Sequence, residues 1–183
     1  MPGKFKRIGI RVPATATEVE AHGLVCRILQ TGAERVAVGF DKPDDDWAPI
    51  WVILTKTQGT IISIEPGVEK YEAVDHVAKL ARRWGAIAIG HLHSSWMVSK
   101  PAAALAAVAQ GGSTEGLERD EIILVGTYTM GNAKQYTARI ERYDDAPPTL
   151  APFEVMVDTT AGDGWGVEGA MVTPLLAALQ RVG

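Results

Sequence analysis

Residues 69–94 read EKYEAVDHVAKLARRWGAIAIGHLHS, and this stretch decides how the chain is expected to fold. Its first two thirds place apolar residues three and four positions apart, which is typical of an amphipathic helix with one buried stripe. Gly85 suits the position that directly follows a helix C-terminus. The apolar run 86–89 then predicts a strand that leads directly into His91 and His93.

Strands are expected on the N-terminal side of this unit. Apolar residues alternate with others in 8–12 and again in 36–40, as they do in half-buried strands. The continuous apolar run 50–55 predicts a central strand that is buried on both faces. Gln58-Gly59 is a turn candidate, so 60–64 is predicted to pair with that strand in a hairpin.

The segment 20–29 fits a helix or a strand by its apolar pattern alone. Gly23 and the short apolar run Leu24-Val25-Cys26 favour a strand. An extended segment would place the side chains of Glu20 and His22 on the same side, because residues two apart in a strand share a face.

The C-terminal half continues the alternation of elements. Pro101 suits the first turn of a helix that runs to about Gln110, and Asp144–Pro148 is the best linker candidate. The chain is therefore expected to be α/β (α+β), a single domain with a mixed sheet and flanking helices, in which 1–145 form the domain and 146–183 a C-terminal extension that packs on it or links from it. The remaining predicted elements are strands at 121–129, 135–143 and 153–157, a glycine-rich loop at 162–169 and a short helix at 174–182.

Composition narrows the class of protein. A chain of 183 residues with 46% hydrophobic and 22% charged residues fits one globular domain. The net charge of −4 argues against a nucleic-acid partner, and the single cysteine, Cys26, excludes an internal disulfide and a cysteine-rich zinc site. The basic start has no apolar run long enough for a secretory signal or a membrane span, so the expected compartment is the cytoplasm, with no membrane partner.

His91 and His93 form a candidate metal site. In an extended strand two such residues share a face and lie about 6.5–7 Å apart, so both imidazoles can reach one zinc ion at about 2.0–2.1 Å. Leu92 between them would face the core. The alternative is a pair of histidines that cap a strand and hydrogen-bond to loop backbone, and spacing alone leaves both interpretations open.

The helix at 69–84, the short strand after it and Gly90-His91-Leu92-His93-Ser94 resemble the JAB/MPN domain, which is the fold of the JAMM metalloproteases. The motif of that family is an early glutamate, then His-x-His-Pro, then Ser-x-x-Asp. Glu20-Ala21-His22-Gly23 is similar to the early Glu-x-x-Gly. The resemblance covers roughly residues 5–143 and implies an MPN/JAB-like, cytidine deaminase-like layered architecture.

The resemblance also implies roles for single residues. His91 and His93 match the two histidines that bind zinc, which leaves a position for a water whose pKa the metal lowers to about 7. Glu20 matches the acid/base that takes the proton of this water. Ser99 is a weaker match for the hydroxyl that stabilises the oxyanion.

The aspartate ligand of the family has no match in this chain. The family spacing places Pro101 and Ala104 at the serine and aspartate positions, and a shortened loop that uses Ser99 places Ala102 at the aspartate position. His22 is the candidate substitute, because an extended segment would turn it to the same side as Glu20.

Three functions remain open. The balance favours a catalytically degenerate MPN/JAB-like domain that acts as a binding or assembly module for a protein or peptide partner. The alternative is a zinc-dependent peptidase or isopeptidase with an altered third ligand. A weaker alternative is a metallophosphoesterase, since Gly90-His91-Leu92-His93 resembles the Gly-His-x-His motif of those enzymes, although their upstream Asp-x-His and Gly-Asn-His motifs are missing here. An oligomeric state does not follow from the sequence.

Overall fold

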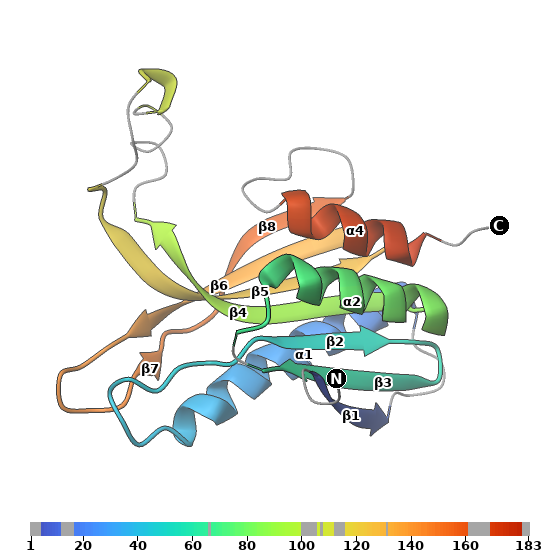
Figure 1. Ribbon diagram of the computed structural model, residues 1–183, viewed down its shortest axis with the longest axis horizontal. Helices are drawn as coiled ribbons and strands as arrows, with labels where there is room; N and C mark the ends of the chain where they lie inside the picture. The colour runs from blue at the N-terminus through green and yellow to red at the C-terminus, as the bar shows by residue number, and fades with distance from the viewer. Residues whose placement is uncertain are drawn as a thin grey trace.

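A curled β-sheet with helices on both faces forms the structure (Figure 1). The computed structural model describes residues 5–11, 17–65, 67–99, 106, 108–111, 116–130, 132–160 and 169–180. The helices are α1 (Glu18–Val38), α2 (Lys70–Trp84) and α4 (Gly169–Leu179). The strands are β1 (Phe5–Arg11), β2 (Ile50–Leu54), β3 (Gln58–Ile64), β4 (Ala88–Val98), β5 (Arg119–Thr129), β6 (Asn132–Glu141), β7 (Thr149–Leu150) and β8 (Glu154–Thr160).

The strands follow the order β1-β3-β2-β4-β5-β6-β7, and β8 pairs with β6 as well. Every pair between the described strands is antiparallel, so the expectation of a mixed sheet is wrong. The reason lies in the connections. Short turns reverse the chain between β2 and β3 and between β5 and β6, and α2 returns it to the other side of β2, where β4 again runs antiparallel to β2.

Two separate hydrophobic clusters hold the layers together, one on each face of the sheet. We call the side covered by α1 the α1 face and the opposite side the α2/α4 face (Figure 1). Because side chains alternate along a strand, neighbours such as Trp51 and Val52 enter different clusters. The α1 face buries Ala21, Val25, Leu29, Ala33, Val52, Leu54, Leu92 and Val125, and the α2/α4 face buries Trp51, Ile53, Val74, Val77, Ile89, Tyr128, Leu175 and Leu179.

Helix α1 overturns the predictions of strands at 20–29 and 36–40. Its buried residues Ala21, Val25, Leu29 and Ala33 recur every four positions, which gives a helical stripe that outweighs the glycine at 23. The helix begins with a capping box: the Thr17 hydroxyl accepts from the N–H of Glu20, and the Glu20 carboxylate accepts from the N–H of Thr17. A threonine followed three residues later by a glutamate is a sequence signal for a helix start, and this signal outranks the apolar run.

The helix at the centre of the chain is confirmed. Lys70–Trp84 form α2, and Gly85 takes a left-handed conformation with φ of 64°, as expected for a glycine after a helix end. The hairpin of β2 and β3 is also confirmed, although Gln58 and Gly59 belong to β3 and the turn lies at 55–57. Thr55 closes this turn, since its N–H donates to the Gln58 carbonyl at 2.8 Å.

The strand that carries the histidines is longer than predicted. The sequence predicts a strand that leads into the histidines, whereas β4 continues to Val98, which pairs with Arg119 of β5. The pairing with β5 supplies hydrogen bonds that the local sequence does not reveal. Most of the helix predicted at 101–110 and the glycine-rich loop at 162–169 lie outside the described residues.

The C-terminal segment belongs to the same unit as the rest of the chain. β7 and β8 both hydrogen-bond to β6, and α4 adds Leu175 and Leu179 to the cluster that α2 forms on the sheet. The chain is thus a single α+β domain. Among the helices described, none has the length and apolar character required to cross a membrane.

Candidate functional site

His91 and His93 lie side by side on the α2/α4 face of β4. Strand alternation turns both imidazoles to this side, and their ring centroids are 5.1 Å apart. Leu92 points the opposite way into the α1-face cluster, where it is 1% exposed, as the sequence predicts. The local sequence therefore pairs the two histidines correctly, because it requires only that this segment be extended.

The imidazole of His91 is completely buried. Trp51 meets it edge to face with 5.0 Å between ring centroids, and Tyr128 lies 5.6 Å away. Gly126 stands opposite His91 in the register of β4 and β5, and a Cβ there would come within 2.8 Å of the imidazole Cε1 and Nε2 atoms. Only a glycine at position 126 leaves room for the His91 imidazole to lie against the sheet.

A small cavity opens beside His93, next to the start of α2. Its volume is about 110 Å³, and it is lined by Pro49, Trp51, Ile64, Val68, Lys70, Ala73, Leu92 and His93. Two of these side chains, Lys70 and His93, are polar, and most of the others are apolar. The cavity has room for a few water molecules or a small ligand group.

The structure does not bring Glu20 to the histidines. Glu20 sits in the first turn of α1, on the far side of the sheet, where its Oε2 atom accepts from the Thr17 N–H at 2.7 Å and from the Thr17 hydroxyl at 2.8 Å. These bonds, the backbone one first, lower the pKa of the Glu20 carboxyl. A carboxylate that is already held in a helix cap is a poor candidate for a base that must contact a water at the histidines.

His22 also lies on the α1 face. The extended segment that would have paired it with Glu20 is a helix, in which residues two apart point in very different directions. His22 is 6% exposed, and its Nε2 atom shares a hydrogen bond with the Thr127 hydroxyl of β5. The sheet therefore separates His22 from His91 and His93, and the geometric basis for His22 as a third ligand is lost.

Ser99 lies just beyond the far end of β4. It is six residues after His93 along an extended chain, which corresponds to about 20 Å. Its N–H donates to the Glu118 carbonyl at 3.0 Å, so it belongs to the outer end of the hairpin of β4 and β5. The candidate aspartate positions Ala102 and Ala104 lie outside the described residues.

The donor set fits part of a zinc site. Two imidazoles on one tetrahedral zinc ion have ring centroids about 5 Å apart, which agrees with the distance between His91 and His93. A catalytic zinc centre needs three protein ligands. In the part of the chain that the structure describes, no three histidine, cysteine, aspartate or glutamate side chains are grouped for this purpose. The described residues therefore do not fit a complete catalytic centre, and no hydrolytic step follows from them.

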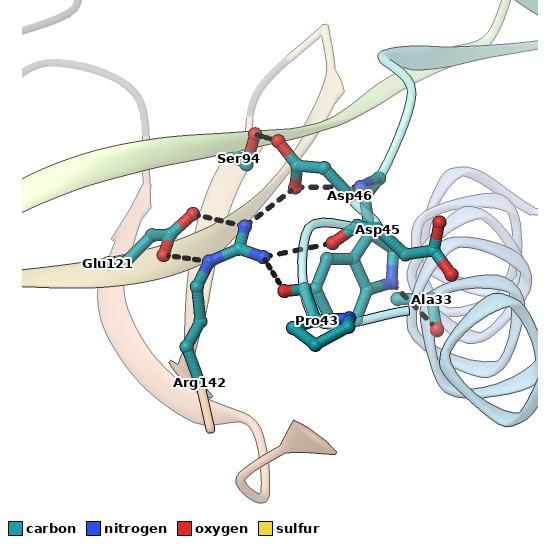
Figure 2. A network of polar contacts seen from close by, with 8 residues as sticks. Ala33, Pro43, Asp45, Asp46, Ser94, Glu121 and Arg142 are labelled. Carbon is teal, nitrogen blue, oxygen red and sulfur yellow. Dashed lines mark hydrogen bonds and ion pairs between the residues drawn. The ribbon is translucent and has the colours of Figure 1, made fainter. Parts of the chain in front are cut away.

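Sequence reasoning missed a polar network next to this strand, which Figure 2 shows. Arg142, just after β6, donates from Nε and Nη2 to the two carboxylate oxygens of Glu121 at 2.6 and 2.7 Å. Its Nη1 donates to the carbonyls of Pro43 and Asp45 at 3.2 and 2.9 Å. The hydrogen bond to Glu121, followed by the negative charges of Glu121, Asp46 and Asp44, raises the pKa of Arg142. No local sequence pattern predicts this network, because its residues are far apart in the chain.

The same network reaches β4 through Asp46. The Ser94 hydroxyl donates to Asp46 Oδ2 at 3.2 Å, and Asp46 Oδ1 accepts from the N–H of Trp47 at 2.7 Å. The Trp47 indole donates in turn to the Ala33 carbonyl of α1 at 2.9 Å (Figure 2). The acidic run at 44–46 thus helps to connect the loop after α1 to the strand that carries the histidines.

No protein-family model, curated protein or solved structure matches the chain. The resemblance to the JAB/MPN domain stays an expectation from the sequence.

The capping box of α1 predicts a stability that depends on pH. We expect Thr17→Ala to lower the free energy of unfolding by about 1 kcal/mol, the usual cost of losing an N-cap hydroxyl. The part due to the Glu20 charge is present at neutral pH and is lost as the pH falls through the folded-state pKa, because this pKa is depressed and protonation removes the negative charge that strengthens the hydrogen bonds from Thr17. Urea unfolding of wild type and Glu20→Gln at several pH values checks this. A difference that persists unchanged in acid contradicts it.

Proposed function

We propose that the chain is an MPN/JAB-like domain without the hydrolase chemistry of that family, which acts as a binding or assembly module for a protein or peptide partner. One observation carries the proposal: the two histidines lie on the α2/α4 face, and the carboxylate of Glu20 lies across the sheet in the cap of α1. The order of α2, β4 and the histidine pair supports the family, as it does in the sequence.

The argument against hydrolysis is that the carboxylate of Glu20 cannot contact a water molecule bound at the histidines. A general base must contact the water whose proton it takes, directly or through one further water. The carboxylate of Glu20 is separated from His91 by the thickness of the sheet and already accepts two hydrogen bonds from Thr17. The peptidase alternative with Glu20 as base thus has no support from the geometry, and a metal held by two histidines would be weakly bound.

The hairpin of β4 and β5 supports a binding role. It extends well beyond the body of the sheet (Figure 1), and Trp96 on β4 is 64% exposed there. Tryptophan is enriched among the residues that dominate protein interfaces, because its large ring buries much surface when a partner covers it. We therefore take this hairpin as the partner-binding part of the proposed module.

Elemental analysis of the purified protein tests the loss of hydrolase chemistry. We expect wild type to retain clearly less than one zinc ion per chain after dialysis, and to cleave neither isopeptide-linked nor linear peptide substrates above the rate of Glu20→Gln. His93→Ala serves as the metal variant beside His91→Ala, since His93 is less buried and its loss perturbs the core less. One zinc per chain that is lost in both variants, together with cleavage that Glu20→Gln abolishes, would establish the peptidase instead.

Cross-linking in cells followed by mass spectrometry tests the binding role. A partner is expected to cross-link near β4 and β5, and this cross-link is expected to disappear in Trp96→Ala. Tyr71→Ala is the matched control, since Tyr71 is an aromatic side chain of α2 that is 57% exposed. Equal loss in both variants, or cross-links only elsewhere, contradicts the assignment of the hairpin.

A further inference from the structure

A groove on the α1 face, opposite the histidine pair, has the features of a small-molecule site. It lies between the start of α1 and the strands β5 and β6, and its volume is about 450 Å³. The residues that line it are Val19, His22 and Gly23 from α1, Thr129 from β5, and Asn132, Lys134 and Tyr136 from β6. Most of these residues carry polar side chains, in contrast to the apolar α1-face cluster further along the helix.

The sheet and the helix bring these groups together from distant parts of the chain. Asn132, Lys134 and Tyr136 alternate along β6 and so share its α1 face, on which Tyr136 packs against the hydrophobic cluster. His22 reaches the same floor from α1, since it contacts Thr127, two residues before Thr129 on β5. The groove is therefore built by regular elements, which position side chains more closely than loops do.

The side chains that line the groove are rich in hydrogen-bond donors. Lys134 carries a positive charge and donates only, while the Tyr136 and Thr129 hydroxyls and the Asn132 amide can each donate as well. No carboxylate is present among the described residues that line it. Such a set matches a ligand that accepts hydrogen bonds and carries negative charge, and bonds between charged groups are the strongest of this kind.

Gly23 adds an independent argument. A glycine inside a helix is unfavourable, so its presence needs a reason. A Cβ at position 23 would meet no other atom within 4 Å, which means that no neighbouring side chain requires the glycine. Gly23 does line the groove, so a larger side chain there would narrow the groove. The glycine keeps this space open.

The cysteine below the groove does not make it a thiol-based catalytic site. Burial is the main cause that raises the pKa of the Cys26 thiol, against smaller opposite effects of Tyr136 and Lys134. A raised pKa keeps the sulfur protonated at neutral pH, and the thiolate is the reactive form. Cys26 therefore does not supply a nucleophile to this groove, and the lining side chains are suited to ligand binding.

We propose that this groove binds a small organic molecule through an oxyanion, a phosphate or a carboxylate group, with Lys134 as the charged anchor and His22, Tyr136 and Thr129 as hydrogen-bonding partners. The N–H groups of Thr17 and Glu20 are engaged in the capping box, so the side chains and not the helix end supply the recognition. The site is separate from the proposed partner-binding hairpin, because its lining residues come from the start of α1 and from 129–136, whereas Trp96 pairs with Glu121 at the other end of β5.

An NMR titration with inorganic phosphate, and separately with acetate, tests the proposal at constant ionic strength. We expect saturable shifts of the backbone amides of Gly23 and Lys134 in the millimolar range, and at least a roughly tenfold weaker affinity in Lys134→Met, which is the factor that a hydrogen bond to a charged group typically contributes. Tighter binding of phosphate assigns a phosphate ligand, and tighter binding of acetate assigns a carboxylate. Either result supports the site.

Two matched controls keep the test independent of folding. Lys56→Met removes an exposed lysine from the turn between β2 and β3 and is expected to leave the affinity unchanged. Gly23→Leu is expected to abolish binding, while Gly32→Leu, at another α1 glycine with open space around it, is expected to retain it. Shifts scattered over surface lysines, or equal losses in Lys134→Met and Lys56→Met, would overturn the proposal.

Discussion

Gly90→Ala is expected to lower the free energy of unfolding by about 3 kcal/mol, the upper range for an extra methyl group in a well-packed core. Gly90 lies on β4 directly before His91 and faces the side chains of α1. A Cβ there would overlap Val25 Cγ1, come within 2.7 Å of Leu29 Cδ1 and lie 3.3 Å from the Gly126 carbonyl oxygen. Since two of these atoms are side-chain atoms of α1, either these side chains or the helix itself has to move away from the sheet. Urea unfolding measures the loss.

A control and a rescue make this result specific. Gly9→Ala, on β1, places its methyl where nothing lies within 4 Å, and it is expected to change stability by no more than about 0.5 kcal/mol. Val25→Ala removes the atom that the new methyl meets first. In the double variant Gly90→Ala/Val25→Ala we therefore expect a smaller loss than the sum of the two single losses. Additive losses would show that the contact between α1 and β4 is not the cause.

Arg142→Met is expected to cost about 2 kcal/mol of stability. The change removes a paired bond to Glu121 and two bonds to the carbonyls of Pro43 and Asp45 (Figure 2). The Glu121 side chain is only 13% exposed, so its carboxylate is left with little access to water when the guanidinium is gone. Hydrogen bonds to charged groups contribute about 1.5–3 kcal/mol, and the partial exposure of Arg142 keeps the expected total near the low end.

The neighbouring arginine is the matched control. Arg139 lies on β6 with a side chain that is 64% exposed, and it forms an ion pair with Asp120 at 3.8 Å. Arg139→Met is expected to cost no more than about 0.5 kcal/mol, as is usual for surface pairs. Hydrogen exchange adds a local readout: in Arg142→Met the amides of the loop at 41–47 are expected to exchange faster than in Arg139→Met. Equal stabilities of the two variants would contradict a special role for Arg142.

The elements that could be predicted are those whose signal is local. Helix α2 combines a regular apolar stripe with Gly85 at its end, and the central strand β2 is a continuous apolar run, so neighbouring residues alone specify them. The same holds for the histidine pair, which requires only that β4 be extended. Helix α1 was predicted as a strand because its apolar stripe contains a glycine and a short apolar run. The threonine and glutamate at its start were the better signal.

The wrong prediction of a strand at 20–29 is the reason why Glu20 and His22 were expected at the histidine site. With 20–29 extended, Glu20 and His22 would share a side and offer an acid/base and a third ligand. As a helix, the segment turns Glu20 back to its own N-cap and His22 down to Thr127. Strand pairing also extends β4 beyond the histidines to Val98, which places Ser99 away from the histidines. The position of Glu20 follows from the local capping box, whereas the position of His22 and the length of β4 follow from contacts between residues far apart in the chain.

By itself the sequence determined the run from α2 into the paired histidines, the absence of a disulfide and the α+β class. The order of residues sets helical stripes and strand alternation, and these need no distant partner. Only the tertiary structure decided which side of the sheet each group occupies. A sheet covered by helices on both faces keeps its two sides apart, so Glu20 and His22 lie with α1 while His91 and His93 lie with α2 and α4. Packing of α1 on β5 then placed His22 beside Lys134 and Tyr136 of the neighbouring strand β6, and these side chains line a groove that no local sequence pattern predicts.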